Sequence, residues 1–157
     1  MDASLADLFS TGADFDLCNR LAVRISDVHG NDVDATALSD EERTIYLVWG
    51  ALGVIGNGGF HYLFESSIKG DPYYALTRHA FEAIGCWEAA EAFGLALAAF
   101  PDSRPPASQA KRLRAYARHM PGLPSAADRA FFAAQGAIEK CLANWVRSRQ
   151  RALMHLA

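Results

Sequence analysis

Residues 56–66 read Gly-Asn-Gly-Gly-Phe-His-Tyr-Leu-Phe-Glu-Ser, and they lie between two apolar helical patterns. Glycine and asparagine adopt positive φ at low cost, so Asn57 and Gly58 predict a break in the helix. Gly59 then allows the backbone to pass close to another helix, and Phe60 begins a new inward-facing pattern. The stretch predicts a corner at which the chain turns through its core, which favours an architectural role over a catalytic one.

Helical patterns extend on both sides of this corner. Residues 14–28 repeat apolar side chains every three or four positions, and Gly30 follows as a stop signal. Ser39 begins a capping box that ends at Glu42, so we expect a helix there that continues until the glycines at 50–59 break it. The helices expected after the corner are 60–66, one opened by Asp71 and Pro72 and stopped by Gly85, 87–100 and 108–120. Ser125 to Asp128 forms a second capping-box-like start, for a long helix that reaches Leu153.

The composition favours an all-α fold. The chain has 157 residues, of which 29 are alanine, whereas valine, isoleucine and threonine together number only 16. We predict an irregular bundle of six or seven helices without strands. The chain length fits one domain, residues 1–157, made of an acidic N-terminal helical segment (1–38) and a core (39–157).

Charge is unevenly distributed along the chain. The formal net charge is −3, but residues 1–42 carry −8, residues 43–102 carry −3 and residues 103–157 carry +8. Such asymmetry is typical of adhesive surfaces, or of two ends that attract each other within one fold or within a dimer. The pairing interpretation is favoured here.

Several protein classes are not indicated. The first seven residues are acidic where a secretory signal would be basic, and the longest apolar run, residues 92–100, is too short to cross a bilayer. Cys18, Cys86 and Cys141 are odd in number and widely spaced, which is typical of reduced thiols rather than of a disulfide framework. We therefore expect a cytoplasmic protein.

Signals for metal, nucleotide or covalent chemistry are weak. His61 and Glu65, and His79 and Glu82, could each share a helix face, but HExxH and Glu-x-x-His are absent. The glycines at 53–59 lack the GK[ST] of a phosphate-binding loop and follow no strand, and no GxSxG occurs. We expect no metal, no cofactor and no enzymatic activity, although a catalytic triad built from distant residues stays open.

The basic C-terminal third allows two readings. Lys111, Arg112, Arg114 and Arg118, together with arginines 147, 149 and 151, could contact nucleic acid, but a sequence pI near 5.9 favours solvated helix faces. The aromatic stripe of the last helix, Phe131, Phe132 and Trp145, is more typical of a core than of a partner surface. It also allows a homodimer, because long terminal helices often self-associate.

The corner motif is the feature that resembles a known family. The order of Asn57-Gly58-Gly59-Phe60, an aromatic helix before it (46–49), Ala-Phe-Glu-Ala-Ile-Gly-Cys after it (80–86) and Phe100-Pro101 resembles the DNA-mimic-protein family over about residues 40–150. The family places Gln two residues and Asn five residues after the phenylalanine, where this chain has Tyr62 and Glu65. If those amides serve a shared ligand, this chain has lost it.

The resemblance implies a helical bacterial protein that binds another protein, and in one acidic member carboxylates imitate DNA phosphates. For this chain we expect a non-enzymatic domain that occupies a DNA-binding regulator and contacts neither nucleic acid directly nor a membrane. The candidate partner-binding carboxylates belong to Asp32, Asp34, Asp40, Glu41 and Glu42, which cluster in sequence. Two alternatives stay open: a toxin-neutralising protein, and a ligand or enzymatic pocket at the corner lined by Asn57, His61, Tyr62 and His79.

Overall fold

The computed structural model describes residues 4–157, which contain eight α-helices, three short 3-10 helices and no strand. The all-α prediction is confirmed, with slightly more helices than expected. The elements are α1 (Leu5–Thr11), α2 (Asp14–His29), η1 (Ala35–Ala37), α3 (Asp40–Glu65), α4 (Ala75–Ala83), α5 (Trp87–Leu97), η2 (Pro101–Ser103), α6 (Gln109–His119), α7 (Ala126–Arg147), α8 (Gln150–Leu153) and η3 (Met154–Leu156).

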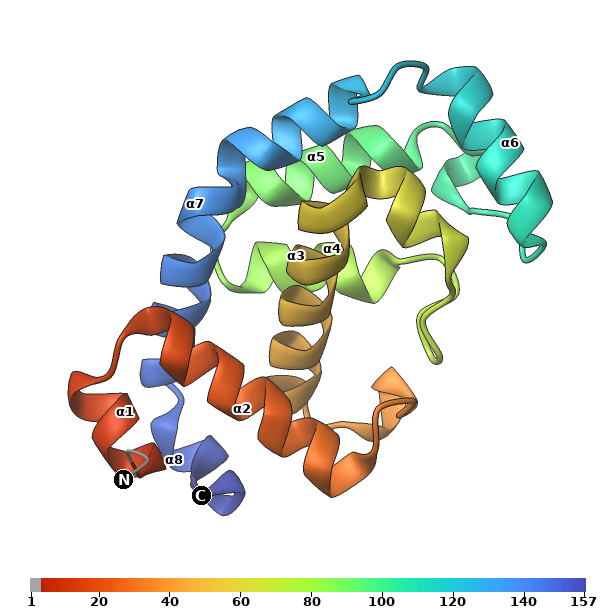
Figure 1. Cartoon of the computed structure of the whole chain (residues 1–157). Helices are drawn as coiled ribbons and strands as arrows, with labels where there is room; N and C mark the ends of the chain where they lie inside the picture. Colours follow the sequence, from red (N-terminus) through yellow and green to blue (C-terminus); the bar gives the residue numbers. More distant parts are fainter. Residues whose placement is uncertain (1–3) are drawn as a thin grey trace.

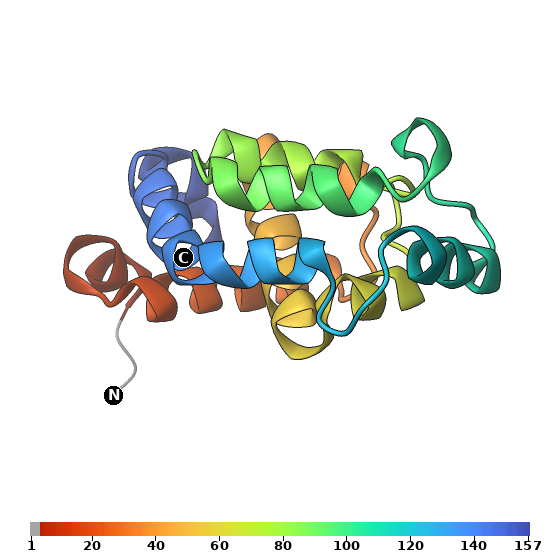
Figure 2. The ribbon, with the colours of Figure 1, turned by 90° about the horizontal axis from the view of Figure 1, so that it is seen from above.

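Two long helices form the middle of the molecule. Helix α3 contacts α2, α4, α6 and α7, and α7 also packs against α2 and α5. Seen from above, α4 and α5 lie on one side of this middle layer and α2 lies on the other (Figure 2). Helices α1 and α8 lie at one end of the molecule and α6 lies at the opposite end (Figure 1).

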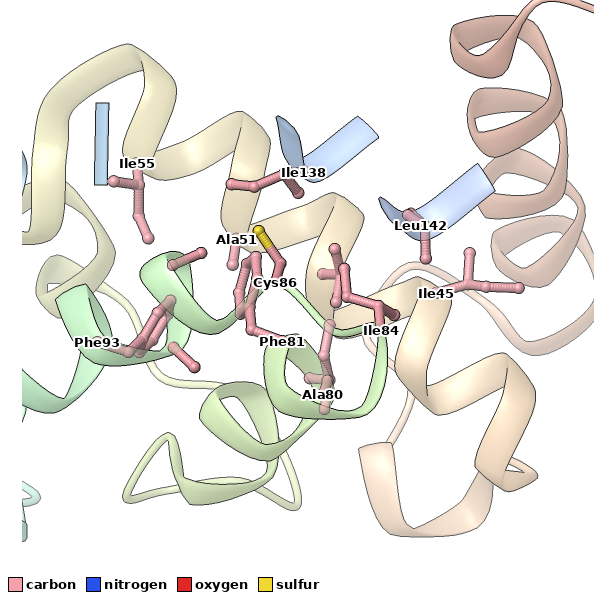
Figure 3. Packing of buried hydrophobic residues seen from close by; sticks show 14 of the residues in the cluster. Ile45, Ala51, Ile55, Ala80, Phe81, Ile84, Cys86, Phe93, Ile138 and Leu142 are labelled. Atoms are coloured by element: carbon pink, nitrogen blue, oxygen red, sulfur yellow. The ribbon is translucent and has the colours of Figure 1, made fainter. Parts of the chain in front are cut away.

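A cluster of aromatic rings fills the core where the helices meet. The ring of Phe60 lies edge-on to those of Phe93 and Phe131, with centroids 5.0 and 5.7 Å apart, and Phe81 stands edge-on to Phe131 at 5.8 Å. All four side chains are fully buried. Aliphatic residues of α3 and α7 continue the core beside Phe81 and Phe93 (Figure 3). The residue after the corner is therefore central to the packing of α3, α4, α5 and α7.

The prediction that glycines 50–59 break the helix is wrong for all but one of them. Helix α3 continues from Asp40 to Glu65, and inside it only Gly59 leaves helical geometry, with φ 72°. Asn57 and Gly58 are helical, so the positive φ expected of them occurs one residue later. A glycine in a helix interior costs only about 1 kcal/mol relative to alanine, which the packing of a long helix can offset.

Three other boundaries differ from the expectation. Helix α1 was not expected, although Ser4 and Asp7 form a capping box. Helix α4 begins at Ala75 rather than at Pro72, and the carboxylate of Asp71 still accepts hydrogen bonds from the amides of Leu76 and Thr77 at 3.0 and 2.8 Å. The last helix ends at Arg147, and α8 begins after a short break.

Candidate functional site

The corner is held by a carboxylate from the first turn of α7. Because Gly59 interrupts the helix, the amide of Phe60 is free to donate to Asp128 Oδ1, at 2.7 Å. Asp128 Oδ2 accepts from the amide of Ser125 at 2.8 Å, within the capping box that starts α7. Asp128 is only 2% exposed, so one buried carboxylate joins the corner of α3 to the start of α7.

Gly59 is required at this position for two independent reasons. A Cβ placed there would lie 2.5 Å from Asp128 Oδ1, and the positive φ is unfavourable for any side chain. Gly59 and Phe60 are buried, whereas Asn57 and Gly58 are exposed. The second half of the motif therefore has a packing role, and the first half faces solvent.

The candidate acids lie where α2 passes into α3, but they differ in surroundings. Asp32 and Asp40 are exposed, and Asp34 and Glu41 are partly exposed. Asp34 accepts hydrogen bonds from Thr36, from its hydroxyl at 2.6 Å and its amide at 2.9 Å, and these bonds lower the pKa of Asp34. Asp40 pairs with Arg43. Asp40 and Glu41 line one hollow and Asp32 lines another, so the four carboxylates do not share a single cavity.

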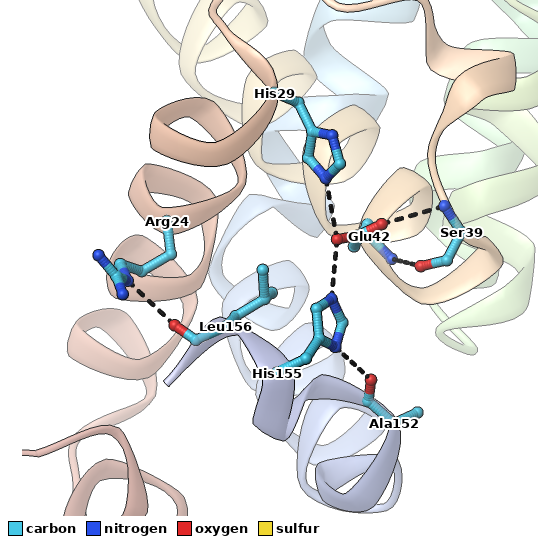
Figure 4. A network of polar contacts seen from close by, with 7 residues as sticks. All are labelled: Arg24, His29, Ser39, Glu42, Ala152, His155 and Leu156. Carbon is cyan, nitrogen blue, oxygen red and sulfur yellow. Dashed lines mark hydrogen bonds and ion pairs between the residues drawn. The ribbon is translucent and has the colours of Figure 1, made fainter.

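Glu42 does not lie on that surface. It is 5% exposed, and its Oε1 accepts from His29 Nε2 at 3.1 Å and from His155 Nε2 at 3.0 Å (Figure 4). Burial raises the pKa of Glu42, but the hydrogen bonds from the two histidines and Ser39 outweigh it and hold the pKa at about 2. Among the predicted partner-binding acids, Glu42 has instead an internal role, because it ties α2, α3 and the C-terminal segment together.

His155 is held between two acceptors. Its Nδ1 lies 2.9 Å from the carbonyl oxygen of Ala152, while its Nε2 faces Glu42. Both ring nitrogens must donate to make both bonds, so the two bonds form together only when the ring is protonated, and the hydrogen bond to Glu42 raises the pKa of His155. Beside it, Arg24 Nε donates to the carbonyl of Leu156 at 3.0 Å.

One arginine of the basic third is buried. Arg112 is 4% exposed and donates to the carbonyls of Phe64 and Ser66 at 2.7 and 3.1 Å, which places a positive charge at the C-terminal end of α3. A surface role for Arg112 in nucleic-acid contact is therefore wrong. Arg147 is also engaged: its Nη1 donates to Asp14 at 2.7 Å, a pairing of the basic and acidic parts of the chain.

The four residues that were expected to line one pocket at the corner do not line the same cavity. Asn57 lines a groove between α2, α3 and α7, whereas His79 lines the hollow beside Asp40, and His61 and Tyr62 line neither. His61 faces Glu65 at 3.5 Å, and His79 faces Glu82 at 3.4 Å. Within residues 4–157, no group of three or more His, Cys, Asp or Glu side chains is placed to hold a metal ion.

Sequence reasoning missed the long-range contacts of two side chains. The sequence does indicate, and the structure confirms, the capping box that joins Ser125 to Asp128. The bond of Asp128 to Phe60 spans 68 positions and has no local signal. His155 gave none either, because its partner Glu42 is 113 positions away.

Two further observations concern the predicted aromatic core of the last helix and the length of the apolar helices. Phe131 is fully buried, as expected of a core residue, but the same expectation is wrong for Phe132, which is 39% exposed on α7. In the part of the chain that the structure describes, no helix combines the length and the apolar character that crossing a membrane requires.

The comparisons with known proteins agree with the corner motif. Residues 36–149 match the family described as DMP19-like proteins, and these residues include the corner, both capping boxes of the middle layer and Asp128. No curated protein and no solved structure matches the chain. Since the match covers well over half of the sequence, the chain belongs to the DMP19-like protein family, a family of DNA-mimic type.

Proposed function

We propose that this protein binds a DNA-binding regulator and occupies its DNA site with carboxylates in place of phosphates. The observation that carries the proposal is a group of four carboxylates where α2 passes into α3: Asp32 and Asp40 are exposed, and Asp34 and Glu41 are partly exposed. We name these four residues the acidic segment. Glu42 is excluded from it because it is buried.

The chemistry of the acidic segment suits such mimicry. Phosphates are ionised and fixed in space, and a mimic needs carboxylates that share both properties. Asp34 is held by two hydrogen bonds from Thr36 that lower its pKa, and it therefore stays charged well below neutral pH. The first turn of α3 presents Asp40 and Glu41 from a capped helix. No catalytic step is part of the proposal.

The test compares two variants of equal charge. In the first, the acidic segment is neutralised by Asp32→Asn, Asp34→Asn, Asp40→Asn and Glu41→Gln. In the matched control, four exposed acids elsewhere are neutralised by Asp16→Asn, Glu65→Gln, Glu88→Gln and Glu91→Gln. Each protein is immobilised, and cell proteins retained by the wild type and the control but not by the first variant are identified by mass spectrometry.

The purified partner then decides the mechanism. We expect a DNA-binding protein whose affinity for this chain falls about tenfold or more between about 50 and 300 mM salt and whose binding is displaced by DNA. An affinity that holds steady with salt, or equal binding by the two variants, would show that the acidic segment does not act as a phosphate mimic.

A further inference from the structure

A groove of about 720 Å³ opens between α2, α3 and α7, on a part of the molecule that the acidic segment does not reach. Its α3 wall runs from Trp49 to Asn57, whereas Asp40 and Glu41 lie on the first turn of that helix. The volume lies in the range of ligand-binding clefts, and polar and apolar side chains both line it.

Three amide side chains reach this groove from three different helices. They belong to Asn19 of α2, Asn57 of α3 and Gln135 of α7. Asn57 Nδ2 donates to the carbonyl of Gly53 at 2.8 Å, which leaves its side-chain oxygen without a donor. Among the hydrogen bonds of residues 4–157, the side chains of Asn19 and Gln135 make none. The groove therefore offers unused donors and acceptors in one place.

An aromatic pair stands at the same groove. Phe15 is 52% exposed, and its ring lies tilted against that of Trp49 with centroids 5.5 Å apart. The exposed face of the Phe15 ring, next to Trp49, can pack against an apolar side chain of a ligand.

The charges of the groove select among ligands. Asp14 is paired with Arg147, and Glu139 and Lys140 make no ion pair among the described residues. Asp14 and Glu139 both line the groove, and both raise the pKa of the buried Cys18 thiol, after burial itself. The lining therefore offers one unpaired charge of each sign, and Glu139 is complementary to a lysine or arginine.

We propose that this groove binds an extended peptide segment of a partner protein, with an aromatic side chain next to a lysine or arginine. An extended backbone has free N–H and C=O groups that can pair with Asn19, Asn57 and Gln135. A bound helix has already satisfied its backbone groups and would leave these amides buried without partners. The aromatic side chain packs against Phe15 and Trp49, and the basic one faces Glu139.

This inference rests on one part of the proposed function, namely that the protein binds another protein. The experiment that tests the groove does not depend on the acidic segment. A phage-displayed library of random nonapeptides is selected on the immobilised full-length chain, and the recovered peptides are synthesised. Their affinity is measured by calorimetry, and their site is mapped by NMR of the side-chain amides of Asn19, Asn57 and Gln135. We expect an aromatic–basic consensus and shifts at these amides.

Variants then locate the site. Gly136 lines the groove and has open space where a Cβ would stand, so Gly136→Leu fills the groove without disturbing the fold. Ala117→Leu, at an exposed position of α6, is the matched control. We expect at least a tenfold loss of peptide affinity for Gly136→Leu, a similar direction for Gln135→Ala, and no change for Ala117→Leu or for the neutralised acidic segment.

Three results would overturn the proposal: no peptide recovered, a consensus without aromatic and basic residues, or unchanged affinity in both Gly136→Leu and Gln135→Ala. None of them affects the acidic segment, whose salt-dependent binding is measured separately. Loss of peptide binding in the neutralised acidic segment, with groove variants unaffected, would place the peptide there and equally reject the groove.

Discussion

Asp128 shows how much of this fold depends on single side chains. Its two oxygens satisfy the amides of Phe60 and Ser125, both in a buried setting. Removing the carboxylate leaves two buried donors without partners, and each unsatisfied donor costs about 1–3 kcal/mol. We therefore expect Asp128→Ala to lower the free energy of unfolding by about 2–5 kcal/mol, measured by urea denaturation.

Asp7 provides the control for this prediction. It occupies the same capping-box position in α1, with Ser4 as its partner, but it is exposed. Because water replaces its bonds, Asp7→Ala should cost less than about 1 kcal/mol. Equal losses in the two variants would mean that Asp128 acts only as a helix cap and that its bond to Phe60 contributes nothing.

Glu42 and His155 make the stability of the C-terminal segment depend on pH. The pKa of Glu42 is lowered from 4.5 to about 2, so its contribution is present above pH 4.5 and is lost as the pH falls toward 2. The pKa of His155 is raised above 6.5, so its contribution is present below pH 6.5 and is lost as the pH rises through the raised value.

We accordingly expect His155→Ala to destabilise the protein most between about pH 4.5 and 6.5 and much less at pH 9. The effect should be modest, because the His155 side chain is 53% exposed and the ion pair is screened. Urea denaturation of the wild type and the variant across this range is the measurement. His119→Ala, at an exposed position of α6, is the control, and a difference that grows toward pH 9 would contradict the assigned charge.

At the scale of elements, α3 contains one glycine that the fold requires, Gly59, and another that it does not require, Gly53. Gly59 has a positive φ and no room for a Cβ, whereas Gly53 is helical with open space around it. Gly59→Ala should lower the free energy of unfolding by about 2 kcal/mol or more, while Gly53→Ala should raise it by about 0.5–1 kcal/mol. Urea denaturation compares them, and destabilisation by Gly53→Ala would show that the glycine has an unrecognised role within the fold.

The same helix shows which parts of the fold local sequence could predict. The capping boxes at Ser39 and Ser125 and the stop at Gly30 are local signals, and the structure confirms all three. The position of the break could not be read locally, because five glycines offer similar freedom and only Gly59 meets Asp128. The start of α4 was misplaced for a related reason: Tyr74 adopts a left-handed conformation before Ala75, which Asp71 and Pro72 do not announce.

The candidate site was less predictable than the fold. A cluster of acids in sequence does not reveal that Glu42 faces two histidines from distant elements while Asp32 and Asp40 face solvent. The groove is assembled from three helices that lie far apart in the chain, and no spacing rule joins Asn19, Asn57 and Gln135. Only the corner motif indicated that this region was distinctive, through its resemblance to a family.

At the scale of the whole molecule, the uneven charge is partly resolved inside the fold. The acidic first part and the basic last part meet through Asp14 with Arg147 and through Glu42 with His155, and Arg24 reaches the carbonyl of Leu156. These contacts support the interpretation that the acidic and basic ends of the chain attract each other within one fold. The acidic segment lies outside these contacts between the two ends, and it is the part of the acidic charge on which the proposed function depends.

The family match ends before the structure does, and this leads to a prediction about the folding unit. The matched residues are 36–149, but α2 places Leu17, Leu21 and Ile25 fully buried against α3 and α7, and Leu153 and Leu156 are buried as well. Burying one such side chain contributes about 1.5–3 kcal/mol, so the five together contribute an amount comparable to the whole net stability of a typical domain. We therefore propose that residues 1–38 form one cooperative unit with 39–157.

The chain cut to residues 36–149 tests this proposal. In the full chain, circular dichroism and tryptophan fluorescence should report one coincident urea transition. The shortened chain exposes the α2-facing side of α3 and α7 and lacks His155, so it should keep helical signal but show no sharp transition and bind a dye for exposed apolar surface. Adding the missing segments separately should not restore cooperativity, because α2 and the C-terminal segment bury different residues. A sharp transition at an unchanged urea midpoint in the shortened chain would mean that the family region folds alone and that both ends are additions to its surface.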